Sequence, residues 1–157
     1  MTAIQYRNGL SVKELVDYSE QLRDEIAFYL FVDSLEGLSV RGLIDSKMVS
    51  GTALNIKPIL AIDIDGKVQL IDKVSGKKKA INKLIEILRQ KGENIVDYPL
   101  SICYSGAEKE AIEMADKIKE YFGDDVQIII SPMTPNSTAL IGLGAIGVAF
   151  HIHKKIH

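Results

Sequence analysis

The chain has 157 residues, of which 46% are hydrophobic and 25% charged, and its formal net charge at pH 7 is -2. This composition predicts an ordinary globular domain over 1–157 and excludes a basic field covering the whole molecule, so no nucleic-acid partner is expected. Residues 1–9 contain no apolar signal segment, and no apolar run approaches the roughly 18 residues that a membrane span requires. A single cysteine, Cys103, cannot form an internal disulfide, which fits an inert buried thiol in a cytoplasmic protein.

The spacing of apolar residues predicts alternating helices and strands along the chain. In chain order, the predicted elements are a helix over 11–24, a buried strand over 27–33, a short helical turn over 34–41, two strands over 56–64 and 67–74, a helix that begins at Lys77 and breaks at Gly92, a strand over 98–104, a helix over 107–122, a strand over 126–130 and a last helix that starts within 136–138 and continues to Ile152. Residues 44–53 fit either a loop or a short helix.

Three of these predictions have specific local signals. Ser11 and Glu14 have the spacing of a capping box, which marks a helix start. Asp65 and Gly66 between two β-rich runs predict a hairpin with a type I′ turn, in which both residues have positive φ. The strand over 126–130 is apolar except for Gln127, and such apolar strands are usually buried on both faces.

Together the elements predict an α/β fold with a mixed sheet. The two strands of the hairpin must be antiparallel because a tight turn joins them, whereas the strand, helix and strand over 98–130 favour a parallel pair. Helices are expected to pack on this sheet within a single domain.

The run from Gly142 to Gly147 matches G-x-G-x-x-G, the letters of a dinucleotide-binding fingerprint. That fingerprint also requires a following strand and an acidic residue about 20 positions further on, and the chain ends at His157. The glycines are therefore expected to let the start of the last helix approach the sheet or a ligand. Free N–H groups at such a helix start can also hold an anion, which leaves a small anion-capturing enzyme as a third hypothesis.

The three histidines are all near the carboxyl end. On a helix, His151 and His153 point about 200° apart and cannot share a metal ion, so we expect these residues and His157 to form a solvated tail. No other pattern supplies a nucleophile with a base or a metal cluster. The sequence thus predicts a binding domain with no catalytic residue, metal or cofactor.

Lys77, Lys78 and Lys79 form a cationic cluster where a strand becomes a helix. Three cations at the positive end of a helix dipole are locally unfavourable, which favours a role in binding phosphate or an acidic partner. The alternative is that they form the solvated side of a helix start.

Four blocks resemble one family in the same order. The chain carries V-D-S-L-E at 32–36, L-N-I-K-P-I-L at 54–60, K-V-S-G-K-K-K-A at 73–80 and G-L-G-A-I-G at 142–147. Together they resemble the second half of DegV proteins, the bacterial fatty-acid-binding family. The resemblance implies the C-terminal α/β domain of a two-domain protein, with the N-terminal domain missing because the chain is a fragment or the gene is truncated.

The resemblance also implies a function. Family members bind one long-chain fatty acid between their domains and present it to a fatty acid kinase, so the DegV-like protein is a carrier and not the enzyme. Carried over to this chain, the expected lipid-binding residues are Thr138, Leu140, Ile141, Gly142, Gly144 and Leu43. The expected kinase-docking residues are Lys77, Lys78 and Lys79.

Polar positions of the family pattern are apolar or small here. Leu140 replaces a family histidine, whereas Leu43 and Ser75 replace arginines. This fits a different or headless lipid, head-group contacts supplied by the missing half, or loss of lipid binding. In the last case the chain is a structural or protein-interaction domain. We further expect the last helix and the hairpin to form one apolar wall, which a homodimer would cover.

Overall fold

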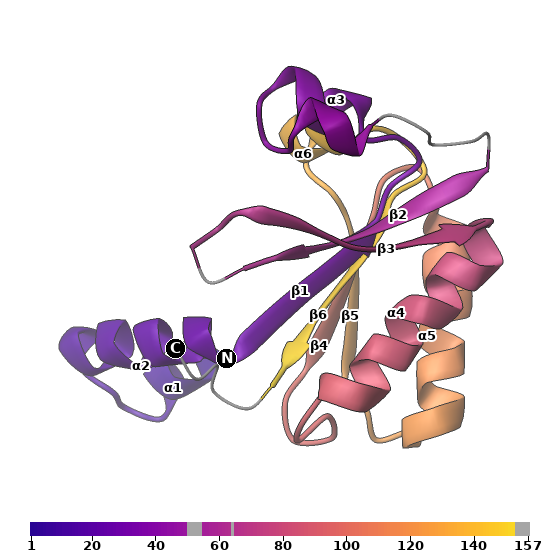
Figure 1. The fold of residues 1–157 in the computed structure, drawn as a ribbon. Coiled ribbons are helices and arrows are strands. Elements are labelled where there is room, and N and C mark those ends of the chain that lie inside the picture. Colours follow the sequence, from indigo (N-terminus) through magenta and orange to yellow (C-terminus); the bar gives the residue numbers. More distant parts are fainter. Residues whose placement is uncertain (50–54, 64, 153–157) are drawn as a thin grey trace.

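Six strands form one sheet in the computed structural model, which describes residues 1–49, 55–63 and 65–152. Across the sheet their order is β3-β2-β1-β6-β4-β5 (Figure 1). The strands are β1 (Ile26–Phe31), β2 (Ile56–Ile62), β3 (Val68–Ser75), β4 (Leu100–Tyr104), β5 (Ile128–Pro132) and β6 (Ile146–His151). β4 and β5 pair parallel, and every other neighbouring pair of these strands is antiparallel. The predicted mixed α/β sheet is confirmed.

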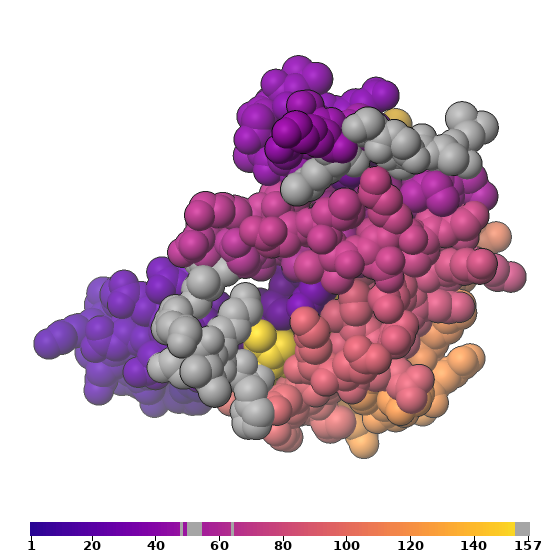
Figure 2. Space-filling view, in the orientation of Figure 1, coloured from indigo at the N-terminus to yellow at the C-terminus, as the bar shows by residue number. Residues whose placement is uncertain are grey.

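Helices lie in three places around this sheet. The helices are α1 (Thr2–Arg7), α2 (Val12–Asp24), α3 (Glu36–Val40), the 3₁₀ turn η1 (Ser46–Met48), α4 (Lys77–Lys91), α5 (Glu108–Phe122) and α6 (Pro135–Ile141). In Figure 1, α4 and α5 run side by side along the sheet, α3 and α6 lie together at one end, and α1 and α2 project near the start of β1. The space-filling view shows the same projection of the α1–α2 pair (Figure 2).

The capping box predicted at the start of α2 is present. The Ser11 N–H donates to the Glu14 carboxylate at 2.8 Å, and the Ser11 hydroxyl accepts from the Glu14 N–H at 3.4 Å. Two backbone donors that a helix start would leave unpaired are thereby satisfied. The helices predicted to follow the hairpin and to span 107–122 are also confirmed, as α4 and α5.

Two apolar clusters bury the two faces of the sheet. The larger cluster lies under α4 and α5, and its fully buried members include Phe31, Ile59, Leu84, Leu88, Ile102, Met114, Ile118 and Ile146. The smaller cluster lies on the opposite face under α3 and α6, and its buried members are Leu30, Val32, Leu35, Leu38, Ile44, Leu60 and Ala145. Alternation along β1 sends Leu30 to one cluster and Phe31 to the other, as the strand period requires.

The hairpin between β2 and β3 is confirmed, but its predicted type I′ turn is wrong. Gly66 has a φ of 79°, whereas Asp65 is absent from the described residues with positive φ. The Gly66 N–H donates to the Asp63 carbonyl at 3.1 Å, and the Asp63 N–H donates to the Lys67 carbonyl at 3.0 Å. This pattern is typical of a hairpin turn with glycine in the left-handed position, which places positive φ on Gly66 and not on Asp65.

The last predicted helix is wrong over most of its length. α6 ends at Ile141, and the chain from Ile146 onward forms β6, which lies between β1 and β4. Gly142, which follows α6, and Gly144 have φ values of 84° and 87°, a backbone conformation that glycine adopts readily. The glycine motif therefore follows the end of a helix and leads into a strand, so it provides no helix start for an anion.

The strand predicted at 126–130 exists as β5, but it is not buried on both faces. β5 is an edge strand of the sheet, and its Ile129 side chain is 57% exposed. Its partner helix α5 covers one face alone, which leaves the other face open. Of the ambiguous segment 44–53, the described part contains η1, and residues 50–53 lie outside the described residues.

Candidate functional site

A cavity of about 220 Å³ lies between the sheet and the helices α3 and α6. Its lining comes from six strands or helices and their loops: Phe28, Leu30, Leu38, Leu43, Leu60, Ile62, Val68, Cys103, Met133, Ser137, Leu140 and Ile141. Apart from Cys103 and Ser137, these side chains are apolar. Such a lining excludes water and favours an apolar ligand.

Strand alternation and helix packing place these side chains around the cavity. Phe28 and Leu30 point to this face of β1 because they alternate with residues that face α4. On the other wall, α3 and α6 are in close contact. A Cβ added to Gly37 in α3 would lie 2.7 Å from the backbone carbonyl oxygen of Leu140 in α6. Glycine at this position thus allows the two helices to approach as one cap over the cavity.

Three of the six residues expected to bind lipid meet at this cavity. Leu140 and Ile141 come from α6, and Leu43 comes from the loop after α3. The sequence analysis predicts that the hairpin and the last helix form one apolar wall. The part of that segment that is helical, α6, does lie on the same side of the sheet as the cavity-lining residues Leu60 and Val68 of β2 and β3.

The other three expected lipid-binding residues lie outside the lining. Thr138 accepts a hydrogen bond at 3.4 Å from the hydroxyl of the buried Ser105. Gly142 is exposed where α6 ends. Gly144 is buried, and its N–H donates to the Ser105 carbonyl at 2.6 Å. These residues stabilise the connection between α6 and β6 and do not form part of the cavity surface.

An ion pair between a buried lysine and a partly exposed aspartate lies beside this glycine loop. The Lys57 ammonium is 2.9 Å from the Asp33 carboxylate, and Lys57 is only 9% exposed. A Cβ added to Gly144 would lie 2.7 Å from the same carboxylate. Because Asp33 neutralises it, Lys57 is not a free cation for a ligand carboxylate.

Cys103 is half-buried and contributes its thiol to the cavity. Burial raises the pKa of this thiol above its ordinary value, and hydrogen bonding with the backbone of Gly147 offsets the effect in part. A thiol kept neutral is a weak nucleophile. This agrees with the expectation of an inert cysteine.

The lysine cluster is remote from the cavity. Lys77 begins α4, which packs on the opposite face of the sheet, and its ammonium is 3.5 Å from the Glu110 carboxylate of α5. Lys78 and Lys79 are exposed. The residues expected to bind lipid and those expected to dock a partner therefore lie on opposite faces of the sheet.

The prediction of a solvated histidine tail is wrong for His151. This residue lies in β6, its side chain is 10% exposed, and its ring stacks on Tyr98 with centroids 4.3 Å apart. Its Nε2 is 3.4 Å from the Glu25 carboxylate. His153 and His157 lie outside the described residues. Within the described part of the chain, no group of three or more His, Cys, Asp or Glu side chains is placed to hold a metal ion, and no helix is long and apolar enough to cross a membrane.

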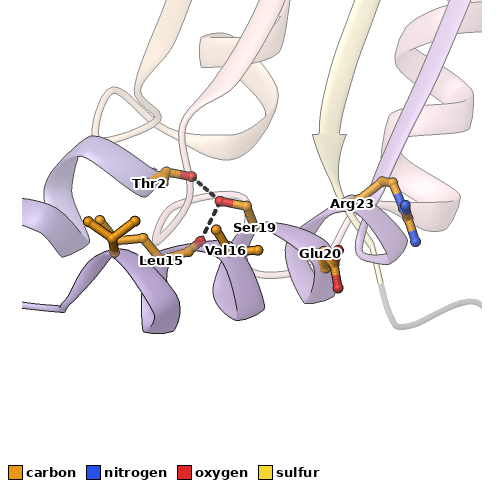
Figure 3. A pocket seen from close by; sticks show the side chains of 7 residues that line it. Thr2, Leu15, Val16, Ser19, Glu20 and Arg23 are labelled. Carbon is orange, nitrogen blue, oxygen red and sulfur yellow. Dashed lines mark hydrogen bonds between the residues drawn. The ribbon is translucent and has the colours of Figure 1, made fainter.

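A second hollow of about 370 Å³ lies between α1 and α2 (Figure 3). The Thr2 and Ser19 hydroxyl oxygens are 3.1 Å apart beside it, and Ser19 also donates to the Leu15 carbonyl at 2.7 Å. α2 buries a single side chain, Leu22, and Val16 in the groove is 53% exposed. This groove is wide open to water, so the smaller cavity under α3 and α6 is the better candidate for an apolar ligand.

Comparison with known proteins identifies the family. A model described as "Uncharacterised protein, DegV family" matches residues 3–153. The chain belongs to the DegV family. The DegV domain-containing protein YqaC of Lactococcus lactis is 33% identical over 148 residues, which cover 94% of this chain and 51% of that protein.

Solved DegV structures have the same fold. A DegV family protein from Ruminococcus gnavus, described with vaccenic acid, has a TM-score of 0.85 and 28% identity, and the match covers 94% of this chain and 52% of that one. A fatty acid binding DegV family protein from Streptococcus agalactiae has a TM-score of 0.75 and 25% identity over the same shares, 94% and 52%. The chain spans about half the length of the DegV proteins it matches.

Sequence reasoning missed most of the cavity. The local pattern predicts that Phe28, Leu30 and Leu60 lie in strands, but it does not assign these side chains to a face of the sheet. Period-2 alternation was the available signal, because the side chains between them face the larger cluster. The contribution of Cys103 required knowing that β4 lies next to β6, which no local pattern indicates.

Proposed function

We propose that this chain is the C-terminal, acyl-chain-holding domain of a DegV fatty-acid carrier. The observation that carries the proposal is the apolar cavity, which combines residues that the family resemblance assigned to the lipid with side chains from β1, β2 and β3. Each methylene buried there contributes about 0.8 kcal/mol. Relatives that are named as binding fatty acids support the ligand class.

The size and lining of the cavity support binding of only part of a fatty acid. Its volume of about 220 Å³ is below the roughly 300–1,000 Å³ of sites that enclose a drug-sized ligand. No lysine, arginine or amide side chain is in the described lining, and an unpaired carboxylate in an apolar site costs several kcal/mol. We therefore place the distal part of the chain in the cavity and the carboxylate outside it, with partners from the other half of the carrier.

Mass spectrometry tests this function directly. Native spectra of the purified chain, after incubation with a long-chain fatty acid, are expected to show the added mass of one acid that denaturing spectra lack. Leu140→Gln puts an amide into the cavity and is expected to abolish the added mass. Leu143→Gln is the matched control, because Leu143 is 69% exposed and outside the lining. Absence of the added mass, even with the N-terminal domain of a relative supplied, would reject the carrier.

A second candidate function is a ligand-free structural or protein-interaction domain. Leucine and serine at the family's polar positions, including Leu43 and Leu140, favour it. The same spectra separate the two functions, because a domain that has lost its ligand binds no acid in either form.

We propose that the exposed lysines dock the fatty acid kinase and that the chain acts in the cytoplasm, as a carrier without catalytic activity or cofactor. The pair Lys78→Glu and Lys79→Glu is the sharper test, since Lys77 is held by Glu110. It is expected to weaken kinase binding while the melting temperature stays unchanged. Unaltered kinase binding would remove this role. A homodimer that covers the apolar wall is part of the same proposal, and sedimentation analysis of the chain tests it.

A further inference from the structure

Gly147 is an unusual residue for the middle of a sheet. It lies in β6, is buried, and pairs with Leu30 of β1 and Cys103 of β4. Glycine weakens a strand interior, and it often marks a place where another group approaches closely. Gly147 is not among the described glycines with positive φ, so its backbone conformation suits any residue. The reason for a glycine here must be steric.

The group that approaches Gly147 is the ring of Phe28. A Cβ added to Gly147 would lie 2.7 Å from both Cε2 and Cζ of Phe28 and 3.1 Å from the Cys103 sulfur. The ring therefore lies over the β6 backbone in a niche that exists because residue 147 has no side chain. Both Phe28 and Cys103 line the apolar cavity.

Phe28 also marks a boundary on the sheet. It pairs with Ala149, Ala149 pairs with Ser101, and Ser101 pairs with Ile129, so these four side chains form one row on the same face. Phe28 lines the cavity, whereas the other three residues of the row are outside its lining. Ile129 at the end of the row is 57% exposed. Phe28 is thus the residue at which the cavity lining meets this partly exposed row.

We infer that Phe28 is the partition that sets how long an acyl chain the cavity accepts, and that Gly147 is the niche that holds it in place. This inference rests on the proposed function and deepens it. Removing the ring joins the cavity to the open row and lengthens the accepted chain. A methyl group at Gly147 pushes the ring into the cavity and shortens it.

Competition among fatty acids tests the partition. The chain is incubated with an equimolar set of saturated acids from decanoic to eicosanoic acid, and the bound acids are read by native mass spectrometry. Phe28→Ala is expected to shift the preferred length upward by at least one two-carbon step, and Gly147→Ala to shift it downward. Leu143→Ala is the control, since Leu143 is 69% exposed and outside the lining, so this variant is expected to keep the wild-type preference. Identical length profiles in all four proteins would overturn the inference.

The lone thiol gives a readout that needs no lipid. Cys103 touches the same niche as the Phe28 ring, so Phe28→Ala is expected to speed its alkylation by iodoacetamide several-fold, and Leu143→Ala to leave the rate unchanged. If the wild-type chain binds no fatty acid, the proposed function fails, while this contrast still decides whether Phe28 closes the cavity. Equal alkylation rates would refute the partition. If Phe28→Ala does not fold, Phe28→Leu replaces it with a smaller expected change in the same direction.

Discussion

Gly37 tests the close contact between the two helices that cap the cavity. Helix propensity alone predicts that Gly37→Ala stabilises the protein by about 1 kcal/mol, because alanine is the better helix former. The structure predicts the opposite sign. The new Cβ would be 2.7 Å from the Leu140 carbonyl oxygen, whereas ordinary contacts begin at 3.4 Å. α3 and α6 must separate by about 0.7 Å, the difference of these two distances, and the obstacle is backbone.

Overpacking of this kind costs roughly 1–3 kcal/mol. For a chain of 157 residues, a loss of about 2 kcal/mol lowers the melting temperature by about 4–8 °C. Thermal unfolding followed by circular dichroism measures the shift. Val40→Ala in the same helix is the control, because Val40 is 88% exposed and the change raises helix propensity without a clash. A higher melting temperature for Gly37→Ala would refute the described contact.

Three further predictions concern charge and titration. Asp33→Asn removes the charge that neutralises the ammonium of Lys57, whose side chain is 11% exposed, and is expected to cost about 1–3 kcal/mol in chemical unfolding. Lys57→Met leaves a carboxylate that is 40% exposed to water and should cost clearly less; equal losses would contradict this order. The raised pKa of Cys103 predicts slower alkylation than free cysteine at mildly alkaline pH, and a rate equal to that of free cysteine would contradict it. Hydrogen bonds from Ser11 lower the pKa of Glu14 below its ordinary value of 4.5. The capping box therefore stabilises α2 fully above pH 4.5, and this stabilisation is lost as the pH falls through the lowered pKa of Glu14 in the folded protein. Hydrogen exchange in α2 should show this dependence, and Ser11→Ala should remove it; an unchanged pH profile in the variant would speak against the capping box.

Local signals predicted the elements whose structure depends on their own residues. The spacing of Ser11 and Glu14 is enough to start α2, and the apolar stripe of α5 is enough to place its buried face. The prediction of a helix up to Ile152 was wrong because a short apolar run fits both helical spacing and a buried strand. What decides between them for Ile146–His151 is the presence of β1 and β4 on either side, which is a long-range property.

The candidate site was predictable in part for the same reason. The family resemblance led to Leu43, Leu140 and Ile141, which line the cavity. It also led to Gly142 and Gly144, whose positive φ values serve the turn between α6 and β6. Residues that line the cavity from the central strands carry no motif, so their role becomes visible only when the strands are placed side by side.

Hydrogen exchange in the projecting α1–α2 pair can report binding of another domain or protein to this end of the molecule. α2 has 13 residues and a single buried side chain, so little of its stability comes from the sheet. Its amide protons should therefore exchange with deuterium as a separate, fast unit while those of β6 remain protected. A domain or protein that binds over the groove beside Val16 is expected to slow this exchange and to leave the exchange rates of the sheet amides unchanged. Assembly can thus be measured on the helix pair independently of events inside the cavity.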